Sequence, residues 1–205
     1  LFAALLLARS GFRPLVLERG PELDERVKAV EHFEKTGELN LNANIQFGEG
    51  GAGTFSDGKL TTRVGDPLCA FVTDAFLQHG APADIAWRQK PHVGTDLLRG
   101  IIRSIRQEII ALGGEVRFNT ALTGLKIENG ALASVETTAG DFACEQLILA
   151  VGHSARDTFA MLHGSGLPLE CKPFSVGFRA EHLQTEIDKS LYHAAAGHPV
   201  LPVGE

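Results

Sequence analysis

Apolar residues recur along the chain with two different periods, and the changes of period divide it into predicted helices and strands. Residues 1–12 (LFAALLLARSGF) are rich in Leu and Ala, which predicts a short helix, and Gly11 is the residue expected to end it. The apolar run PLVLE comes next and is typical of a buried strand that ends at Glu18. Residues 21–40 are rich in charge and predict a solvated helix followed by a loop.

Two amphipathic helices are predicted in the middle of the chain. Asp66 and Pro67 begin the first, as N-cap and first-turn residues, and Gly80 ends it. Thr95 caps a longer helix that ends at the glycine pair 113–114. The apolar residues of this helix recur at intervals of three and four, which places them on one face: Leu97, Leu98, Ile101, Ile102, Ile105, Ile109 and Leu112.

The period changes to two after the second helix, and this change predicts an antiparallel meander. Residues 116–127 alternate as a strand, Asn129–Gly130 is a typical tight hairpin turn, and residues 131–138 form the returning strand. A second turn at residues 139–140 leads into a third strand over residues 142–151. The LILAV end of that third strand is expected to be buried.

A helix over residues 154–162 and a strand over residues 174–180 follow the meander. Strands that alternate with helices, together with the meander, indicate an α/β fold. We expect a mostly parallel sheet with an antiparallel insertion.

Composition narrows the classes of function. The chain has 205 residues, of which 44% are hydrophobic and 21% charged, as in a soluble globular protein. Its formal net charge of −6 argues against a nucleic-acid partner. The longest apolar run, residues 1–8, is too short to span a bilayer and lacks the pattern of a signal peptide, so we expect no membrane partner. The widely spaced Cys69, Cys144 and Cys171 favour a reducing, cytoplasmic compartment.

Residues 47–60 (FGEGGAGTFSDGKL) contain five glycines and match two nucleotide-binding motifs. The G-x-G-x-x-G spacing that starts at Gly48 is that of a dinucleotide fingerprint, but the required helix is not predicted, because residues 54–66 lack a helical period. Residues 53–59 match a phosphate loop one residue short, and Leu60 stands where a Ser or Thr hydroxyl would ligate magnesium. We therefore disfavour a nucleotide hydrolase, the most remote of three functional interpretations.

The predicted helix and strand at the N-terminus have the form of the second half of a βαβ dinucleotide-binding unit. In such a unit the acidic residue that ends the strand accepts hydrogen bonds from the adenosine ribose hydroxyls, a role that would fall to Glu18. A generic helix–strand pair with an exposed glutamate fits the same pattern, so both interpretations stay open. If the segment is part of a dinucleotide-binding unit, the glycine fingerprint is expected to precede Leu1, and the chain is expected to be a piece of a larger protein.

Several stretches together resemble one protein family. LFAALLLARSGFRPLVLERG resembles the segment after the fingerprint in FAD-dependent oxidoreductases of the glutathione-reductase-like FAD/NAD(P)-binding superfamily. Four other stretches resemble one branch, the bacterial FAD-dependent dehydrogenases or NAD(FAD)-utilizing dehydrogenases: NIQFGEGGAGTFSDGKL, KPHVGTDLL, LGGEVRFNTALTGL and LILAVGHSARDTF. The resemblance covers nearly the whole chain. Because members of this family are longer at both ends, it implies a fragment that lacks the N-terminal GxGxxG and the C-terminal part.

The resemblance implies a Rossmann-like FAD/NAD(P)-binding domain with a parallel sheet, an antiparallel β-meander crossover and part of a substrate domain. Residues 1–63 and 96–165 would form the FAD-binding part, and residues 64–95 and 166–205 the substrate or cap region. It implies FAD as the cofactor, hydride transfer through flavin N5, a small-molecule substrate, and NAD(P)H or the substrate itself as electron donor. The alternative is a flavin-binding module or inactive fragment without turnover. Substrate and oligomeric state are not assigned.

The resemblance also implies a set of cofactor-binding residues. Glycines of the loop would turn backbone N–H groups toward the pyrophosphate, because side chains would block the approach, and the hydroxyls of Thr54 and Ser56 would add donors. The complete expected set is Glu18, Arg19, Gly50, Gly51, Ala52, Gly53, Thr54, Ser56, Lys59, Val116, Ala150 and Gly152.

Several of these roles have an open alternative. Lys59 would neutralise phosphate or the pyrimidine edge of the reduced flavin, or be a plain surface lysine. Val116 would offer its backbone to the adenine edge, or be an ordinary core valine. Gly152 would let the chain pass close to the cofactor. The adjacent His153 would be a catalytic acid, a polar neighbour of the cofactor or a helix cap.

No catalytic acid, base or nucleophile is assigned. Arg156 and Asp157 are expected to form a local surface pair, and His92 is a lone histidine at the entrance to the substrate region. The histidines show neither HxxxH nor HExxH spacing, so no metal site is predicted. The serines lack the G-x-S-x-G context of a hydrolase.

Overall fold

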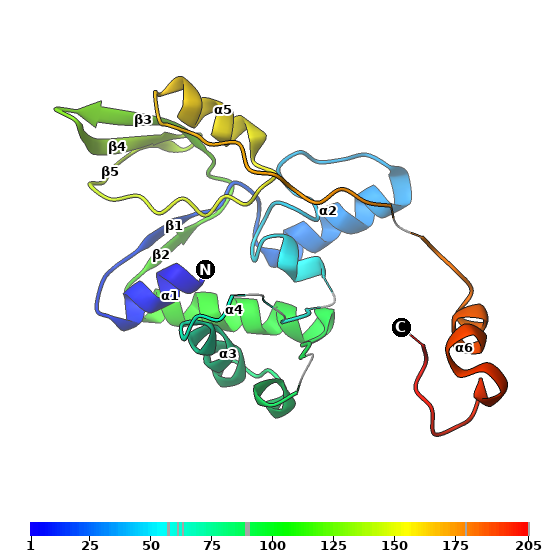
Figure 1. Cartoon of the computed structure of the whole chain (residues 1–205). Coiled ribbons are helices and arrows are strands. Elements are labelled where there is room, and N and C mark those ends of the chain that lie inside the picture. Colours follow the sequence, from blue (N-terminus) through cyan, green and yellow to red (C-terminus); the bar gives the residue numbers. More distant parts are fainter. Residues whose placement is uncertain (57, 61, 63, 89–90, 179, 205) are drawn as a thin grey trace. The chain divides into compact units, whose positions relative to one another are not determined.

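The computed structural model describes residues 1–56, 58–60, 62, 64–88, 91–178 and 180–204. The chain divides into two compact units, Leu1–Pro168 and Leu169–Glu205 (Figure 1). The helices of the first unit are α1 (Phe2–Arg9), α2 (Leu23–Thr36), α3 (Cys69–Gln78), α4 (Thr95–Ala111) and α5 (Arg156–Gly164), with the short 3₁₀ helices η1 (Ala52–Phe55) and η2 (Ala83–Ala86). Its strands are β1 (Leu15–Leu17), β2 (Glu115–Arg117), β3 (Leu122–Glu128), β4 (Ala131–Thr137) and β5 (Gly140–Ala143).

The strands form one parallel and one antiparallel sheet. β1 pairs with β2 in parallel, with Val16 opposite Val116. β3, β4 and β5 form an antiparallel meander in which Val135 of β4 lies opposite Leu125 of β3 and Phe142 of β5. The predicted α/β fold with a parallel sheet and an antiparallel meander is confirmed. α5 contacts β3, and α4 contacts both α1 and β2 (Figure 1).

The stretch predicted as one strand over residues 116–127 is two strands that belong to different sheets. Between them Asn119 has a φ of 53°, a left-handed conformation that asparagine tolerates better than most residues. The N–H of Asn119 donates to the carbonyl of Gly20, and the N–H of Thr120 donates to that of Glu18, both at 2.9 Å. These bonds continue the β1–β2 contact past the strands and turn the chain toward the meander.

The strand predicted over residues 142–151 forms only at its start, in β5, and the strand predicted over residues 174–180 does not form in the described residues. β5 ends at Ala143, and residues 147–151 have no strand structure; Ile148 is 62% exposed, so the expected burial of LILAV is wrong. In the second unit, residues 174–178 are also unpaired, with Phe174 and Val176 both 84% exposed, and position 179 lies outside the described residues. An apolar run becomes a strand only where another strand accepts its backbone hydrogen bonds, and within the described chain neither run has one.

The helix starts differ slightly from the prediction. The side chain of Asp66 accepts the N–H of Leu68 at 2.7 Å, as a cap would, but the α-helix itself begins at Cys69. Thr95 is the first residue of α4 and not its cap. Its hydroxyl donates instead to the carbonyl of Ser56 at 2.8 Å, which ties the helix start to the glycine loop.

The hydrophobic core of the first unit is built on the apolar stripe of α4. Five of the seven predicted residues are buried: Leu98, Ile101, Ile102, Ile105 and Ile109. Leu97 and Leu112 are exposed because they lie at the margins of the helix. The stripe packs with buried residues of α1, α3, η2 and the segment before α4: Ala4, Leu5, Ala75, Phe76, Ile85 and Val93. Burial of this apolar surface is the main force that holds these helices together.

The core also bears on the predicted division of the chain. Residues 64–95 were expected to belong to a substrate region, yet α3 and η2 share one core with α1 and α4. The boundary between the two compact units falls after Pro168. The assignment of the two parts to cofactor and substrate stays a prediction.

The second unit is small. It contains α6 (Gln184–Tyr192) and the 3₁₀ helix η3 (His193–Ala195). The side chain of Gln184 donates to the carbonyl of Gly204 at 2.8 Å, and Asp188 accepts the N–H of Gly204 at 2.7 Å. These two bonds fold the terminal segment back onto α6.

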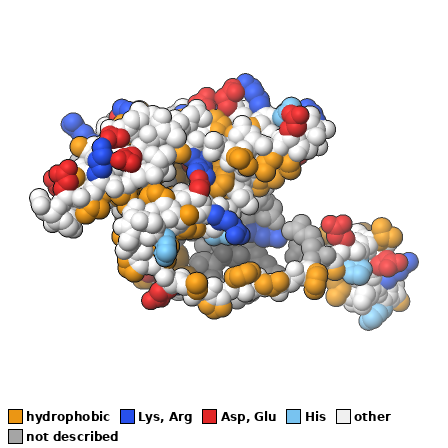
Figure 2. All heavy atoms as spheres, turned by 90° about the horizontal axis from the view of Figure 1, so that it is seen from above, with side chains coloured by type: hydrophobic (Ala, Val, Ile, Leu, Met, Phe, Trp, Pro, Cys, Tyr) orange, Lys and Arg blue, Asp and Glu red, His pale blue; other side chains and the backbone are white. Residues whose placement is uncertain are grey.

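Charged side chains of both signs are interspersed over the face shown in Figure 2 and do not gather into a patch of one sign. As far as the chain is described, it has no helix with the length and apolar character needed to cross a membrane.

Candidate functional site

A small cavity of about 60 Å³ lies where β1, β2 and the glycine loop meet. Its lining comes from segments that are far apart in the sequence: Leu1, Val16, Glu18, Glu49, Gly50, Arg106, Val116 and Phe118. The structure therefore brings together three of the expected cofactor residues, Glu18, Gly50 and Val116. Within the described chain, the other expected residues do not line this cavity.

Glu18 follows β1 directly and connects two backbone segments. Its Oε1 accepts the N–H of Gly20 at 2.9 Å and the N–H of Gly48 at 3.1 Å. The other oxygen, Oε2, receives no hydrogen bond from the described residues. One oxygen thus holds the loop in place while the second keeps lone pairs for further O–H or N–H donors.

Arg19 forms an ion pair with Asp157 of α5. Its Nη1 lies 3.3 Å from Asp157 Oδ1, Nη2 contacts Oδ2, and the guanidinium lies 4.7 Å from the centre of the Phe47 ring. The hydrogen bond from Arg19 lowers the pKa of Asp157. The expected pair between Arg156 and Asp157 is wrong, because the carboxylate of Asp157 turns to Arg19 instead.

Arg26 of α2 is 0% exposed. The segment that leads into the glycine loop, residues 44–49, folds around its guanidinium. Its Nε donates to the carbonyl of Asn44 and its Nη2 to that of Ile45, both at 2.9 Å. Its Nη1 donates to the carbonyls of Glu49 at 2.6 Å and Gly48 at 3.3 Å. Burial lowers the pKa of Arg26 to about 10, against the opposing influence of Glu18 and Glu49.

Sequence reasoning missed Arg26 because residues 21–40 were interpreted as a solvated helix with its charges in water. A signal was present, since Leu23, Arg26 and Val30 are spaced by three and four and share one face of α2. All three are buried. An arginine on the apolar face of a charged helix is therefore the pattern that would have found it.

Two of the loop glycines are required by internal contacts. A Cβ on Gly48, which has a φ of 114°, would lie 2.4 Å from Arg26 Cδ. A Cβ on Gly50, which has a φ of 82°, would lie 2.2 Å from Thr54 Oγ1 and 2.6 Å from Ile102 Cδ1. At Gly51 and Gly53, by contrast, no atom lies within 4 Å of such a Cβ. Close packing therefore excludes a side chain at Gly48 and Gly50, a left-handed φ of 64° favours glycine at Gly51, and the space beside Gly53 is open.

Three of the expected donors are used within the loop. The N–H of Gly51 donates to the carbonyl of Gly48 at 3.0 Å. The hydroxyl of Thr54 is buried and donates to the carbonyl of Glu49 at 3.0 Å, and that of Ser56 donates to the carbonyl of Gly53 at 2.7 Å. In this structure these groups hold the loop together, and their expected role toward a phosphate stays a prediction.

The other expected donors of the loop remain available. Gly50, Ala52 and Gly53 are exposed. In the described part of the chain, no group accepts their N–H. Backbone amides of this kind are suited to an anionic oxygen.

A buried ion pair supports the loop from α4. Glu49 is 4% exposed, and its Oε2 accepts the N–H of Leu23 at 2.9 Å. Its Oε1 lies 2.7 Å from Nε of Arg106, although the N–H is not aligned with the oxygen. Burial raises the pKa of Glu49, while the Leu23 N–H and Arg106 act in the opposite direction. The guanidinium of Arg106 also lies 5.3 Å from the centre of the Phe118 ring.

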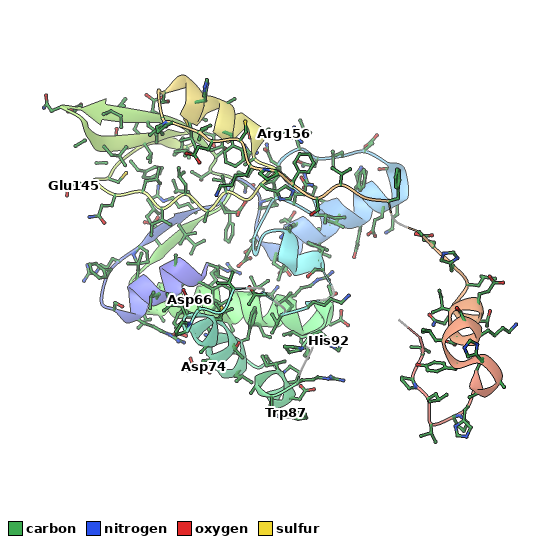
Figure 3. The ribbon with its side chains drawn as sticks, in the orientation of Figure 1. Asp66, Asp74, Trp87, His92, Glu145 and Arg156 are labelled. Carbon is green, nitrogen blue, oxygen red and sulfur yellow. The ribbon has the colours of Figure 1, made fainter. Side chains whose placement is uncertain are left out.

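The remaining sequence candidates lie outside the cavity lining. Lys59 is exposed and forms an isolated antiparallel bridge with His92. Figure 3 shows His92 near α4 and Arg156 in a different part of the first unit.

Ala150 and Gly152 lie in the exposed segment after the meander. His153 Nε2 is 3.4 Å from Ser154 Oγ. The roles proposed for these residues stay predictions.

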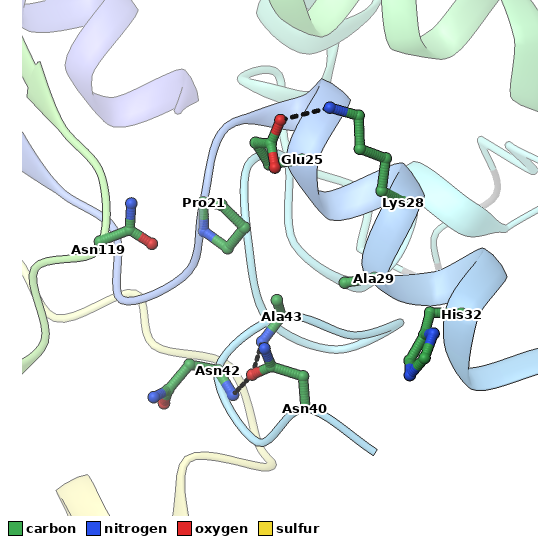
Figure 4. Close-up of a pocket in the computed structure, with 9 residues that line it drawn as sticks. All are labelled: Pro21, Glu25, Lys28, Ala29, His32, Asn40, Asn42, Ala43 and Asn119. Atoms are coloured by element: carbon green, nitrogen blue, oxygen red, sulfur yellow. Dashed lines mark hydrogen bonds and ion pairs between the residues drawn. The ribbon is translucent and has the colours of Figure 1, made fainter. Parts of the chain in front are cut away.

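A larger groove of about 610 Å³ lies between α2 and the loop that follows it (Figure 4). It is lined by Pro21, Glu25, Lys28, Ala29, His32, Asn40, Asn42, Ala43 and Asn119. Glu25 and Lys28 pair at 2.6 Å, and Asn40 Oδ1 accepts the N–H groups of Asn42 and Ala43. No sequence motif indicated this groove.

Comparison with known proteins places the chain in a family. The family model described as FAD dependent oxidoreductase matches residues 99–204. The chain belongs to the FAD dependent oxidoreductase family. A relative from Clostridium beijerinckii, described as an uncharacterized protein, is 50% identical over 201 residues, which is 98% of this chain and 38% of the relative. The chain thus spans less than half the length of this relative.

Solved structures show a weaker likeness to this chain. Glycine oxidase from Bacillus cereus is 13% identical, with a TM-score of 0.48 over 80% of this chain and 56% of that chain. L-amino acid deaminase from Proteus myxofaciens is 15% identical, with a TM-score of 0.40 over 82% of this chain and 46% of that chain. At these scores the likeness supports no argument about substrate.

Proposed function

We propose that this chain holds the adenosine diphosphate half of FAD in a flavin-dependent oxidoreductase. The observation that carries the proposal is that Glu18, Gly50 and Val116, from three distant segments, line one cavity. An acceptor oxygen of Glu18 and an unaccepted N–H of Gly50 give that cavity the two polar groups such a ligand needs. Membership of the FAD dependent oxidoreductase family supports the choice of FAD over other nucleotides.

Each of the three residues has a distinct role in this proposal. Glu18 accepts hydrogen bonds from the ribose hydroxyls, as the acid at the end of a dinucleotide-binding strand does. Gly50 donates its N–H to the diphosphate. The backbone of Val116 meets the adenine edge. FAD, when bound, supplies hydride acceptance at N5, and the chain supplies binding and orientation.

The finer assignments rest on the sequence alone. They are the bacterial FAD-dependent dehydrogenase branch, a small-molecule substrate, NAD(P)H or the substrate itself as electron donor, and a cytoplasmic location. The comparisons give no support for NAD(P)H. A flavin-binding module without turnover is the alternative. The nucleotide hydrolase stays disfavoured, because no α-helix begins among the described residues between η1 and α3.

The experiment uses the complete gene product. It is purified, its visible spectrum is recorded, and the pigment released on denaturation is identified. Flavin absorption bands at about 370 and 450 nm support the proposal. A colourless protein that does not take up added FAD contradicts it. Bleaching by NADH, NADPH or a substrate selects the enzyme, bound flavin that none of them bleaches selects the module, and phosphate release from ATP selects the hydrolase.

A matched pair of variants tests the site itself. Glu18→Ala removes the ribose acceptor and is expected to weaken FAD binding at least about tenfold, because hydrogen bonds to charged groups are strong. Glu31→Ala removes an exposed glutamate of α2 and is expected to leave binding unchanged. Equal affinities for the two variants would show that Glu18 does not contact the nucleotide.

A further inference from the structure

The carbonyl groups around Arg26 fix the direction of the neighbouring amide groups. Four carbonyls converge on this one guanidinium, those of Asn44, Ile45, Gly48 and Glu49. The described chain contains no cis peptide bond. In a trans peptide the C=O and the next N–H point in opposite directions. Each carbonyl that faces Arg26 therefore turns the following N–H away from it.

The peptide that joins Glu49 to Gly50 is held most firmly. Its carbonyl accepts two hydrogen bonds from the same side, from Arg26 Nη1 at 2.6 Å and from Thr54 Oγ1 at 3.0 Å. Its N–H belongs to Gly50, which is exposed and lines the cavity. The described residues offer no acceptor for that N–H. The peptide is fixed on its inner side and open on its outer side.

The charge beneath this peptide is positive, and the groups that accept its hydrogen bonds are neutral, while the carboxylates of Glu18 and Glu49 act on it only through space. Arg26 forms no ion pair within the described chain, and its hydrogen-bond acceptors are all backbone carbonyls. A buried charge that is solvated by peptide dipoles retains a field in its low-dielectric surroundings. An anion that accepts the N–H of Gly50 therefore sits in a favourable potential, whereas an uncharged ligand gains nothing from it.

We propose that Arg26 is the positioning residue of the diphosphate site: it fixes the Glu49–Gly50 peptide so that the Gly50 N–H faces a phosphate oxygen. This inference deepens the proposed FAD function and rests on it. Arg26 does not touch the ligand, and Gly48 is its structural counterpart, because any side chain there would meet Arg26. The ligand class is a nucleoside diphosphate or its ester, and phosphate-free nucleosides do not benefit.

The test compares ADP with adenosine as competitors of FAD on the complete gene product freed of flavin. FAD rebinding is followed by flavin fluorescence, and both affinities are measured for wild type, Arg26→Met, Arg26→Lys and the control Lys28→Met. Arg26→Met is expected to weaken the binding of ADP about ten- to a hundredfold, which corresponds to the strength of a hydrogen bond to a charged group. The affinity for adenosine is expected to stay unchanged. Arg26→Lys keeps the charge and restores part of the loss, while the exposed Lys28 has no effect.

The outcomes separate this inference from the proposed function. Parallel losses for ADP and adenosine indicate a merely structural role and overturn the inference, as does an unchanged ADP affinity. If the wild-type protein binds neither FAD nor ADP, the proposed function fails as a whole. If Arg26→Met does not fold, Gly48→Ala decides by the same ADP-to-adenosine comparison. It retains Arg26 but displaces the loop, because its Cβ would lie 2.4 Å from Arg26 Cδ.

Discussion

Arg9 of α1 and Glu108 of α4 are joined by two hydrogen bonds, from Nε to Oε1 at 2.6 Å and from Nη2 to Oε2 at 2.8 Å. The same carboxylate lies 2.8 Å from Nε2 of His79, whose Nδ1 is 2.7 Å from Ser104 Oγ. One side chain thus connects α1, α4 and the end of α3 at the edge of the hydrophobic core. The hydrogen bond from Arg9 is the main cause that lowers the pKa of Glu108, with a smaller contribution from His79.

This arrangement predicts acid sensitivity. Because the folded-state pKa of Glu108 lies below its ordinary value of 4.5, its contribution to stability is present above that value and is lost as the pH falls through the folded pKa. Arg9→Met is expected to remove part of this acid-dependent loss and to cost less than about 1 kcal/mol at neutral pH, since the pair is partly exposed. Urea unfolding at a series of pH values from about 3, below the usual carboxyl pKa, to about 7 measures the acid-dependent loss and the cost at neutral pH. An unchanged pH slope in Arg9→Met would contradict the prediction.

The buried pair of Glu49 and Arg106 is expected to behave differently from the surface pair. Glu49→Gln or Arg106→Met alone leaves one buried group without its partner and is expected to cost about 3 kcal/mol in free energy of unfolding. The double variant is expected to cost clearly less than the two single effects added together. A double-mutant cycle from urea unfolding measures the difference. Additive effects would show that the 2.7 Å contact contributes no coupling.

The pH dependence of Glu49 has the opposite sign to that of Glu108. Burial raises its folded-state pKa, so its contribution favours the folded state at low pH and is lost as the pH rises through the folded pKa. Glu49→Gln removes this titration. The ratio of variant to wild-type unfolding constants is therefore expected to change between acidic and neutral pH. A ratio that does not vary with pH would show that burial does not perturb this carboxyl.

The core of the first unit offers a simpler test. Ile105 is 0% exposed and belongs to the hydrophobic core of the first unit. Ile105→Ala is therefore expected to cost about 2–5 kcal/mol in free energy of unfolding. Leu97, on the same helix, is 50% exposed, and Leu97→Ala is expected to cost less than about 1 kcal/mol. Urea denaturation of both variants checks the assignment of the buried face. Similar losses would contradict it.

The sequence predicted those features that depend on local pattern. The stripe on α4, the hairpin at Asn129–Gly130 and the strand before Glu18 each follow from spacing within one segment. The meeting of Glu18 and Val116 could be expected as well, because parallel strands that pair bring their ends together. The unpaired LILAV segment could not, since an apolar run does not reveal whether a neighbouring strand exists.

Arg26 shows why the glycine loop was only partly understood from sequence. Arginine is usually exposed, so a buried one is not expected from composition. From the sequence, Gly50, Gly51 and Gly53 are assigned to one cause, the approach of a phosphate. A Cβ at Gly48 would meet Arg26, and one at Gly50 would meet Thr54 and Ile102, all from inside the protein. Contacts between segments far apart in sequence decide which glycine serves packing and which faces outward.

This distinction gives a final prediction about two neighbouring glycines. Gly50→Ala places a Cβ 2.2 Å from Thr54 Oγ1 at a φ of 82°, and it is expected to cost about 2 kcal/mol or more in free energy of unfolding. Gly53→Ala meets no atom within 4 Å, so its stability is expected to stay within about 0.5 kcal/mol of wild type. If the outward face of Gly53 receives the diphosphate, the added methyl weakens FAD binding without this loss of stability. Urea unfolding and FAD titration of the same two variants separate the effects, and a Gly53→Ala protein with unchanged FAD affinity would remove Gly53 from the ligand site.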